Sequence, residues 1–494
     1  MHVTSDQFHE KSAEALKDES LAGALFVLGK MFPLMRETVV AQLPEFDALR
    51  DRARDIRNHA LDHLPDYLDA FEKKVNENGG RVHWARTGAE ANRIVAKLCK
   101  DAGARQVIKS KSMVTEELEL NDHLEEQGLV VTETDLGEYI IQLRKEKPFH
   151  IVGPALHLSA GQVSDTFYEA HKEHGRTQKV EDKVKLVEEA RIVLRERFKN
   201  ADIGITGANF LVAETGQIVL VTNEGNADLT ATLPKRHIVV TGIEKVVPNL
   251  DDVGVLLRLL PRSATGQETS NYVSLYTGPR QNGDGDGPES FDIVLVDNGR
   301  SDMLDSPVKE MLRCIRCGAC LNSCPIYGAV GGQAYGSVYS GPMGSVWTPA
   351  LTSVSQAGDL PNASTFCGKC EEVCPVRIPL PKLMRHWREK EFEQHLSPTT
   401  ARWGLGVWTW LAHHPRAYRF FTSLSLVGMN LMASAPSPKG RWISKLPFIA
   451  AGWTHSRDLS APSGGSFLSQ YKKAQKAAPP KDTARPSNAE GDGK

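Results

Sequence analysis

The sequence predicts a mixed α/β domain followed by a smaller, mainly α domain that is organised around cysteines. Between about residues 81 and 300, short β-type segments alternate with helical segments, a pattern typical of a parallel sheet with helices on its faces. Seven of the eight cysteines then fall between residues 314 and 374. A chain of 494 residues has room for about three domains of ~150 residues each.

The N-terminal residues 1–80 are expected to be helical. The stretch from Phe46 to Asn78 is rich in charges, carries recurring Leu, Ile and Val, and stops at Gly79-Gly80, so it is predicted to be one helical segment. Residues 1–6 lack a basic region followed by an apolar run, so no signal peptide is expected. With 59 basic and 61 acidic residues, the composition indicates no nucleic-acid surface.

The segment that follows is expected to form the α/β domain. A capping-box pattern at Thr87–Glu90 opens a helix that should end at Gly103. Two further helices are predicted at 116–127 and 181–200, the second with Val184, Val187, Ala190, Val193 and Leu194 facing inward. Strands are predicted at 81–85, 106–109, 129–133, 203–206, 210–214, 217–222, 237–241 and 291–296, with an antiparallel hairpin turning at Thr215-Gly216.

Two cysteine motifs carry the clearest chemistry. The first reads C-x2-C-x2-C-x3-C-P, the spacing by which bacterial ferredoxins hold cubane clusters, and the second repeats most of it. In such pairs the last cysteine of each motif serves the other cluster. One cluster would therefore take Cys314, Cys317, Cys320 and Cys374, and the other Cys324, Cys367 and Cys370, with Ser364 at the position of the absent fourth cysteine.

The second cluster leaves alternatives open. It is either a [4Fe–4S] cluster with Ser364, water or a partner as fourth ligand, or a [3Fe–4S] cluster. Zinc explains the motifs poorly, because zinc sites take four ligands in two pairs. Cys99 lies on an apolar helical face and is expected in the core, so no disulfide framework remains and a reducing compartment is indicated.

A further hypothesis is that the α/β domain is itself an enzyme or a small-molecule binding module. Glu224 and Asp228 in a predicted loop at 223–228 would supply a carboxylate base. Lys109, Lys111, Lys235 and Arg236 would bind an anion. The plainer interpretation is that these residues cap turns or are solvated. His150 and His157 flank a predicted strand, and no catalytic residue is assigned.

The chain contains no dinucleotide fingerprint, because Gly204-x-x-Gly207 leads into a strand and not into a helix. The C-terminal stretch is unusual for its five tryptophans, Trp403, Trp408, Trp410, Trp442 and Trp453. No apolar run is long enough to cross a membrane, so this stretch is expected to pack on the cysteine-rich domain, dock a partner or lie on a membrane face. Residues 471–494 are expected to be a disordered tail.

The chain resembles the iron–sulfur subunit of bacterial lactate-utilisation systems. Beyond the two cysteine motifs, the resemblance rests on Ser110–Glu117, Thr134–Glu138, His150–Pro154, Gly204–Asn209, Glu224–Asp228 and Gly332–Pro342. It implies a LUD domain of the sugar-phosphate isomerase/CoA-transferase-like type at 81–300, a dicluster ferredoxin-like domain at 301–394 and a family extension at 395–470. For the alternative function, this fold type implies that the LUD domain would bind or transform a CoA ester or a sugar phosphate-like molecule, with the clusters as accessory groups. It also implies two [4Fe–4S] clusters, with the gap at Ser364 belonging to the family pattern.

The resemblance also implies a function. The chain would carry electrons in a three-protein complex that oxidises L-lactate to pyruvate, with the other two subunits and an unidentified electron acceptor as partners. The two clusters would form a relay, because interleaved motifs hold them close together. The expected location is cytoplasmic, with peripheral association at the inner face of the cell membrane as a further expectation.

Overall fold

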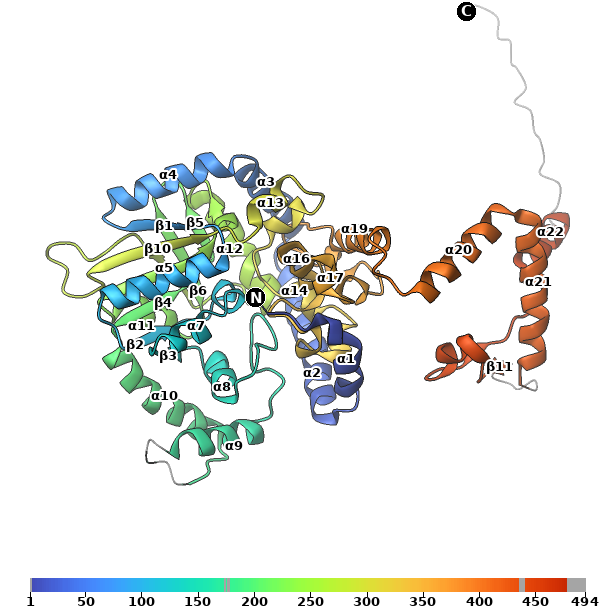
Figure 1. Ribbon diagram of the computed structural model, residues 1–494, viewed down its shortest axis with the longest axis horizontal. Helices are drawn as coiled ribbons and strands as arrows, with labels where there is room; N and C mark the ends of the chain where they lie inside the picture. The colour runs from blue at the N-terminus through green and yellow to red at the C-terminus, as the bar shows by residue number, and fades with distance from the viewer. Residues whose placement is uncertain (1, 173–174, 176–177, 435–439, 478–494) are drawn as a thin grey trace, which may run out of the picture. The chain divides into compact units, whose positions relative to one another are not determined.

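The computed structural model describes residues 2–172, 175, 178–434 and 440–477. The chain divides into two compact units, Met1–Leu396 and Ser397–Lys494, and the elements of both are drawn in Figure 1. The first unit contains two β-sheets, the cysteine motifs and the N-terminal helices.

The larger sheet has six strands, and every neighbouring pair in it is parallel. After β2 the chain moves outward to β3, whereas after β4 it moves the opposite way to β7 and β10. The winding therefore reverses between β2 and β4. In spatial order the strands are β1 (Arg81–Ala85), β10 (Ser290–Val296), β7 (Arg236–Gly242), β4 (Ile203–Thr206), β2 (Gln106–Lys109) and β3 (Val130–Glu133).

Both faces of this sheet are buried, as is usual for parallel strands. Alternation along β10 sends Val294 and Val296 into one apolar core and Phe291, Ile293 and Leu295 into another. The first core includes residues of α5 and α7, and the second includes residues of α4. The helices associated with the sheet are α4 (Leu64–Glu77), α5 (Gly88–Asp101), α6 (Met113–Glu117), α7 (Leu120–Glu126), α8 (Leu136–Arg144), α9 (Ala160–Ala170) and α10 (Lys183–Asn200).

The predicted hairpin is present, but it belongs to a second sheet. Strands β5 (Phe210–Val212) and β6 (Gln217–Thr222) pair antiparallel, as expected. They form a four-stranded sheet in the order β8-β5-β6-β9 with β8 (Val246–Val247) and β9 (Tyr272–Tyr276). Helices α11 (Asn226–Thr232) and α12 (Leu250–Ala264) belong to this part of the chain.

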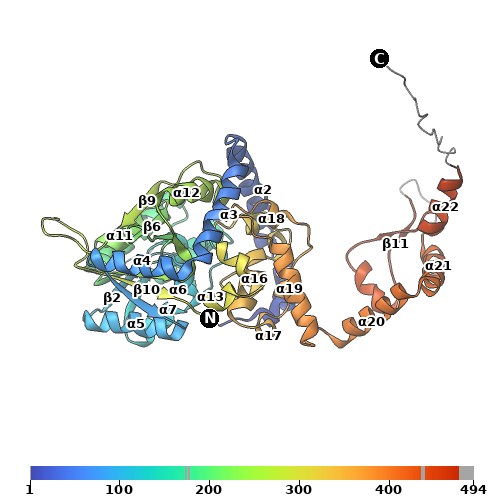
Figure 2. The same ribbon diagram turned by 90° about the horizontal axis from the view of Figure 1, so that it is seen from above.

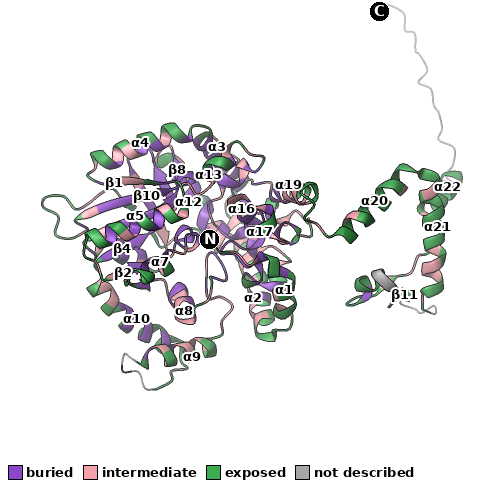
Figure 3. Ribbon diagram, in the orientation of Figure 1, coloured by how far each residue is buried: buried purple, intermediate pink, exposed green. Residues whose placement is uncertain are grey.

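The cysteine-rich region consists of short helices and loops that share a core with the N-terminal helices. Phe8 of α1 (Phe8–Ala15), Leu25 of α2 (Glu19–Ala41) and Phe46 of α3 (Phe46–Asp62) lie in one apolar cluster with Trp347 and Met384. Figure 2 shows α2 and α3 beside α16 and α18, and the buried residues of this region are purple in Figure 3. Residues 1–62 therefore do not form a separate body.

The elements of the cysteine-rich region, in chain order, are α13 (Arg300–Leu304), η4 (Lys309–Arg313), α14 (Ala319–Asn322), α15 (Tyr327–Val330), η5 (Gln333–Tyr335), α16 (Gly341–Leu351), α17 (Val354–Ala357), η6 (Leu360–Asn362), α18 (Lys369–Glu372) and α19 (Leu380–Glu393).

The second unit carries many exposed apolar side chains. Trp403, Trp408 and Trp410 on α20 are all exposed, at 75%, 61% and 53%. Among the helices that the structure describes, none is long and apolar enough to cross a membrane. The elements of the second unit are α20 (Thr399–His413), α21 (Pro415–Met432), β11 (Trp442–Ile443), η7 (Phe448–Thr454), β12 (Leu459–Ser460) and α22 (Phe467–Ala477).

Several local expectations differ from the structure. The helical stretch expected from Phe46 to Asn78 breaks at His63, and the helix expected at 116–127 is split by Glu119, whose φ is 54°. Val184 and Val187 are exposed, because α10 turns Leu186 and Glu189 inward instead.

Two further expectations concern segments that are more ordered than predicted. The loop expected at 223–228 is shorter, since α11 begins at Asn226. Residues 471–477 of the expected tail are helical in α22. The rest of that tail, 478–494, lies outside the described residues.

Candidate metal centres and the adjoining cavity

The two cysteine motifs fold in the same way. In each, the residue before the cysteine at the second ligand position, Cys317 or Cys367, has a left-handed backbone: Arg316 at φ 60° and Phe366 at φ 53°. The glycine that follows the cysteine is also left-handed, Gly318 at 76° and Gly368 at 81°. Left-handed conformations are uncommon outside glycine, so their recurrence marks the motifs as structural repeats. A short helix follows in each, α14 with Cys320 and α18 with Cys370.

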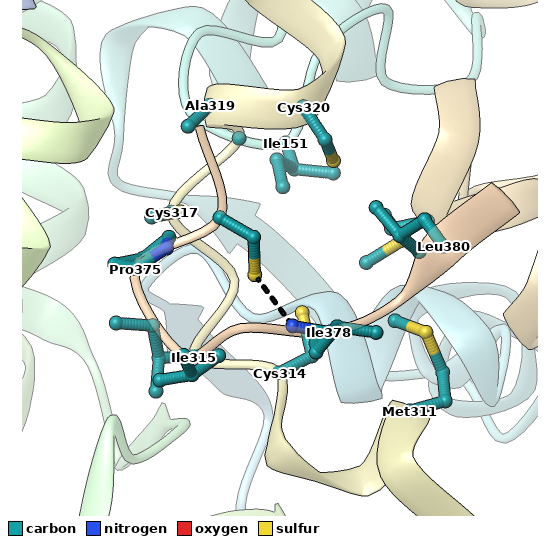
Figure 4. Close-up of a pocket in the computed structure, with 14 residues that line it drawn as sticks. Ile151, Met311, Cys314, Ile315, Cys317, Ala319, Cys320, Pro375, Ile378 and Leu380 are labelled. Carbon is teal, nitrogen blue, oxygen red and sulfur yellow. Dashed lines mark hydrogen bonds between the residues drawn. The ribbon is translucent and has the colours of Figure 1, made fainter. Parts of the chain in front are cut away.

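The first motif and the end of the second enclose an apolar cavity. Cys314, Cys317, Cys320 and Cys374 line it together with Ile151, Met311, Ile315, Ile378 and Leu380, and Figure 4 shows its interior. The Ile378 N–H donates to Cys374 Sγ at 3.3 Å. Burial raises the pKa of Cys374 to about 11 and also raises those of Cys317 and Cys320. Four thiols around one apolar cavity fit the donor set of a cubane cluster.

The remaining cysteines line a second cavity. Cys324, Cys367 and Cys370 surround it with Ser364 and several prolines. Ser364 Oγ accepts a hydrogen bond from the Phe366 N–H at 3.1 Å. Burial raises the pKa of Cys370 to about 12. The two groups of side chains are the same two groups that the crosswise rule predicts, and their binding of clusters stays a prediction.

Arginines from the N-terminal helices bind carbonyl groups of the cysteine loops. Arg50 of α3 donates to the carbonyl oxygens of Cys374 at 2.9 Å and Glu372 at 2.5 Å. Arg36 of α2 donates to Val373 O at 3.2 Å. These contacts orient the chain around Cys374, and they were missed in the sequence because more than 300 residues separate the partners. The local sequence of α2 and α3 carries no signal for them.

A buried charge network joins the sheet domain to the cysteine-rich region. Arg300 bonds both carboxylate oxygens of Glu117, at 3.0 and 2.7 Å, and Glu244 at 2.8 Å. Tyr339 donates to Glu117 at 2.6 Å. Burial alone raises a carboxyl pKa, but Arg300 and Arg316 outweigh it and hold the pKa of Glu244 at about 2. Arg300 likewise outweighs burial at Glu117 and lowers the pKa of that carboxyl, so both carboxylates are ionised at neutral pH.

A cavity of about 410 Å³ lies at the carboxyl edge of the parallel sheet. Ser110 and Lys111 follow β2, Asn209 comes from the loop after β4, and Lys245 comes from the turn after β7. Arg316 of the first cysteine motif completes its cationic wall. Ile151 lines both this cavity and the one formed by Cys314, Cys317, Cys320 and Cys374. The two cavities are therefore direct neighbours.

Lysine and arginine candidates from the sequence separate into different environments. Lys111 lines the sheet-edge cavity, with its Nζ 2.6 Å from Val152 O. Lys109 is fully buried and paired with Glu133 at 2.6 Å, and burial and its carboxylates give it a structural role. Lys235 is exposed, and Arg236 binds Ser290 and the Leu98 carbonyl. The predicted anion site therefore keeps only Lys111 of the four.

The acidic and histidine candidates divide similarly. Glu224 lines the cavity, whereas Asp228 accepts hydrogen bonds from Ser274 and Tyr276 and acts as a structural anchor. The segment around His150 and His157 is not a strand. His150 Nδ1 accepts from the Val152 N–H at 3.1 Å, and burial lowers its pKa to about 4. His157 lies 3.1 Å from Glu146.

Two protein-family models match this chain. The LUD domain family model matches residues 68–296, and a 4Fe-4S dicluster domain model matches residues 310–378. The chain is thus an iron–sulfur protein in which a LUD domain precedes a dicluster domain. A solved structure of a DUF162 family protein from Deinococcus radiodurans is 16% identical, with a TM-score of 0.27, and covers 47% of this chain and 98% of that chain.

Curated relatives match almost the whole chain. "Lactate utilization protein B" of Geobacillus thermodenitrificans is 41% identical over 97% of this chain and 99% of its own. The protein of the same name in Bacillus subtilis is 40% identical over 94% of this chain and 96% of its own. An "uncharacterized electron transport protein" of Escherichia coli is 40% identical over 96% of this chain and 98% of its own. The chain belongs to the lactate utilization protein B family.

Proposed function

We propose that this chain is the iron–sulfur, electron-carrying subunit of a multi-protein system that oxidises L-lactate to pyruvate. Support comes from the dicluster domain and from relatives that are named for lactate utilisation or electron transport. The observation that carries the proposal is the pair of cysteine-lined cavities, one with four thiols and the other with three thiols and a serine.

The first cavity would hold a [4Fe–4S] cluster on Cys314, Cys317, Cys320 and Cys374. The second would hold a [4Fe–4S] cluster on Cys324, Cys367 and Cys370, with Ser364 as fourth ligand, and a [3Fe–4S] cluster is the alternative. When bound, such clusters accept and release single electrons. The protein's own contribution is to exclude water with apolar side chains and to donate backbone N–H groups to sulfur, as Ile378 does to Cys374.

The proposal keeps the domain limits expected from the sequence: the LUD domain at 81–300, the dicluster domain at 301–394 and the C-terminal extension at 395–470. The sequence has no dinucleotide fingerprint, so lactate would meet its first oxidant on one of the other two subunits of the complex. All eight cysteines are free, as in a reducing compartment, which supports a cytoplasmic location. The electron acceptor and any peripheral membrane contact belong to the proposal as expectations.

Iron and sulfide analysis with EPR spectroscopy tests the cluster assignment on protein purified without oxygen. Two [4Fe–4S] clusters give about eight irons per chain and an EPR signal that appears on reduction with dithionite. About seven irons, with a signal in the oxidised sample, would identify [3Fe–4S] in the second cavity. Two or fewer irons together with zinc would refute the proposal.

Matched alanine variants separate the two cavities. C314A should lose the iron of one cluster, whereas C99A should keep the parent's iron content because Cys99 is buried in the core away from both motifs. S364A should alter the EPR spectrum of the second cluster only. An unchanged spectrum in S364A would exclude Ser364 as a ligand and leave water, a partner or a [3Fe–4S] cluster, and the iron count identifies the last of these.

A further inference from the structure

The sheet-edge cavity lies where an open parallel sheet offers a ligand site. Ligands of such sheets bind outside the carboxyl ends of the strands, at the point where the winding reverses. In this chain that point is between β2 and β4. Ser110, Lys111 and Ser112 directly follow β2, and Gly207, Ala208 and Asn209 directly follow β4, and all six line the cavity. Its volume of about 410 Å³ falls within the ~300–1,000 Å³ typical of small-molecule sites.

The charged residues of this cavity favour a monoanion. Its lining holds three cationic side chains, Lys111, Lys245 and Arg316, and two carboxylates, Asp135 and Glu224, a balance of +1. Lys111 lies 4.0 Å from Asp135, and Arg316 lies 3.5 Å from Glu244 outside the lining. Asp135 also accepts from the Gly137 and Glu138 N–H groups as a helix cap. Lys245 is only 6% exposed and makes no ion pair with any residue that the structure describes. A dianion would face the two carboxylates with one charge in excess.

Several polar groups at the cavity lack partners. Among the described residues, Ser110 Oγ, Thr241 Oγ1, Arg316 Nε and Arg316 Nη1 are buried and have no hydrogen-bond partner. Buried polar groups are nearly always paired. These four atoms belong to three residues on separate segments that line one cavity, so a ligand bound there would offer them partners. The Arg316 guanidinium stacks on Trp347 at 3.9 Å, and its side chain is 8% exposed.

The cavity also has an apolar side, which favours a ligand with an apolar group. Ile151, Leu156, Leu220 and Leu260 contribute to the lining. Asn209, Thr222 and Asn226 add neutral polar groups that can pair with a hydroxyl or carbonyl oxygen. The combination suits a short molecule with one anionic end, a small apolar group and a neutral oxygen.

We propose that this cavity binds a small organic monocarboxylate, with Lys111, Lys245 and Arg316 around its carboxylate group. The cavity lining carries the monocarboxylate, and the choice of a 2-hydroxy or 2-oxo acid rests on the proposed function. Since Arg316 sits between Cys314 and Cys317, and Ile151 is shared by both cavities, the ligand would lie beside the first cysteine-lined cavity. A 2-hydroxy or 2-oxo monocarboxylate satisfies every feature of the lining.

Isothermal titration calorimetry of the full, anaerobically purified chain tests this inference. The probes are L-lactate, pyruvate, L-lactamide and inorganic phosphate. We expect saturable binding of at least one of the two carboxylates at one site per chain. L-Lactamide, which matches lactate in shape but has no charge, should not bind, because it leaves the cationic wall unpaired.

Charge-removing variants locate the site. K245M and K111M should each weaken carboxylate binding by about tenfold or more, the effect of losing one hydrogen bond to a charged group. K235M is the matched control, because Lys235 is exposed and lies outside the cavity. It should bind like the parent. If K245M fails to fold, K111M still tests the site, because the Lys111 side chain is 26% exposed and its replacement disturbs the core less.

Several results would overturn the inference: no carboxylate binding at about 10 mM, equal binding of L-lactamide, binding of phosphate alone, or unweakened binding in both K111M and K245M. Iron content measured on the same samples keeps this test separate from the proposed function. A chain that holds iron but binds no carboxylate contradicts only the cavity proposal. A chain that binds carboxylate but holds no iron contradicts only the electron-carrying role.

Discussion

Replacing Arg300 with methionine should destabilise the first unit strongly. Arg300 is the shared cation of Glu117 and Glu244, and all three side chains are at most 1% exposed. Removing one partner of a buried ion pair leaves an uncompensated charge and costs about 3–5 kcal/mol. Arg316, 3.5 Å from Glu244, compensates part of that loss. Glu117 keeps only neutral donors, Tyr339 and Asn298. We therefore expect R300M to lose about 3–5 kcal/mol of unfolding free energy.

Urea unfolding followed by tryptophan fluorescence measures this loss, and Trp347, 5.6 Å from the Arg300 guanidinium, reports on the network itself. R280M is the matched control, because Arg280 pairs with Glu289 at 3.0 Å with both side chains about half exposed. Exposed pairs contribute at most about 1 kcal/mol. The double variant R300M/E117Q should recover part of the loss, since one stranded charge is gone.

The reasoning would be refuted if R300M unfolded at the same urea concentration as R280M. It would also be refuted if adding E117Q made R300M less stable. Either result would mean that the buried carboxylates do not need Arg300.

Two other predictions concern stability. Burial lowers the pKa of His237 to about 3 and that of His150 to about 4. As the pH falls below about 6.5, the unfolded chain binds protons at these histidines before the folded chain does, so the free energy of unfolding decreases by about 2 kcal/mol per histidine between pH 7 and pH 5. Urea unfolding at pH 7 and pH 5 measures this decrease. H237Q should show a smaller decrease than the parent, and an equal decrease would contradict the role given to His237. G332A should lower the free energy of unfolding by about 1–3 kcal/mol, because its Cβ would meet Phe149 O at 1.8 Å. G328A is the control, since its Cβ would meet nothing within 4 Å. Thermal melts compare the two variants, and equal melting temperatures would contradict the close approach at Gly332.

Local sequence was enough to predict most of the strands. Short β-branched runs such as 203–206 and 291–296 are buried on both faces and could hardly adopt another structure. Boundaries failed where a tertiary contact overrode local periodicity. Glu189 turns inward on α10 because it pairs with buried His171 at 2.7 Å, and this rotates Val184 and Val187 outward. The sequence around Glu189 does not predict its pairing with His171.

The sequence predicted the cysteine sets for a related reason. Cysteine spacing within a loop of a few residues is a local property, and it restricts which thiols can reach a common centre. The structure adds that Cys314, Cys317, Cys320 and Cys374 share one cavity, and that Ser364 lines the other with three cysteines. The arginines that orient Cys374 come from helices near the N-terminus, so only the folded chain reveals them.

The sheet-edge cavity is the feature that only the tertiary structure decided. Its cations Lys111, Lys245 and Arg316 are far apart in the chain, and the sequence grouped Lys111 instead with Lys109, Lys235 and Arg236. Lys109 is the last residue of β2 and is held by Glu116 and Glu133, whereas Lys111 lies beyond the end of the strand and lines the cavity. Strand order brings the correct residues together, because parallel strands from distant segments end at one edge of the sheet. The spacing of cysteines within a short segment determines which thiols can share a cluster, whereas the residues of a binding cavity are brought together only by the order of the strands.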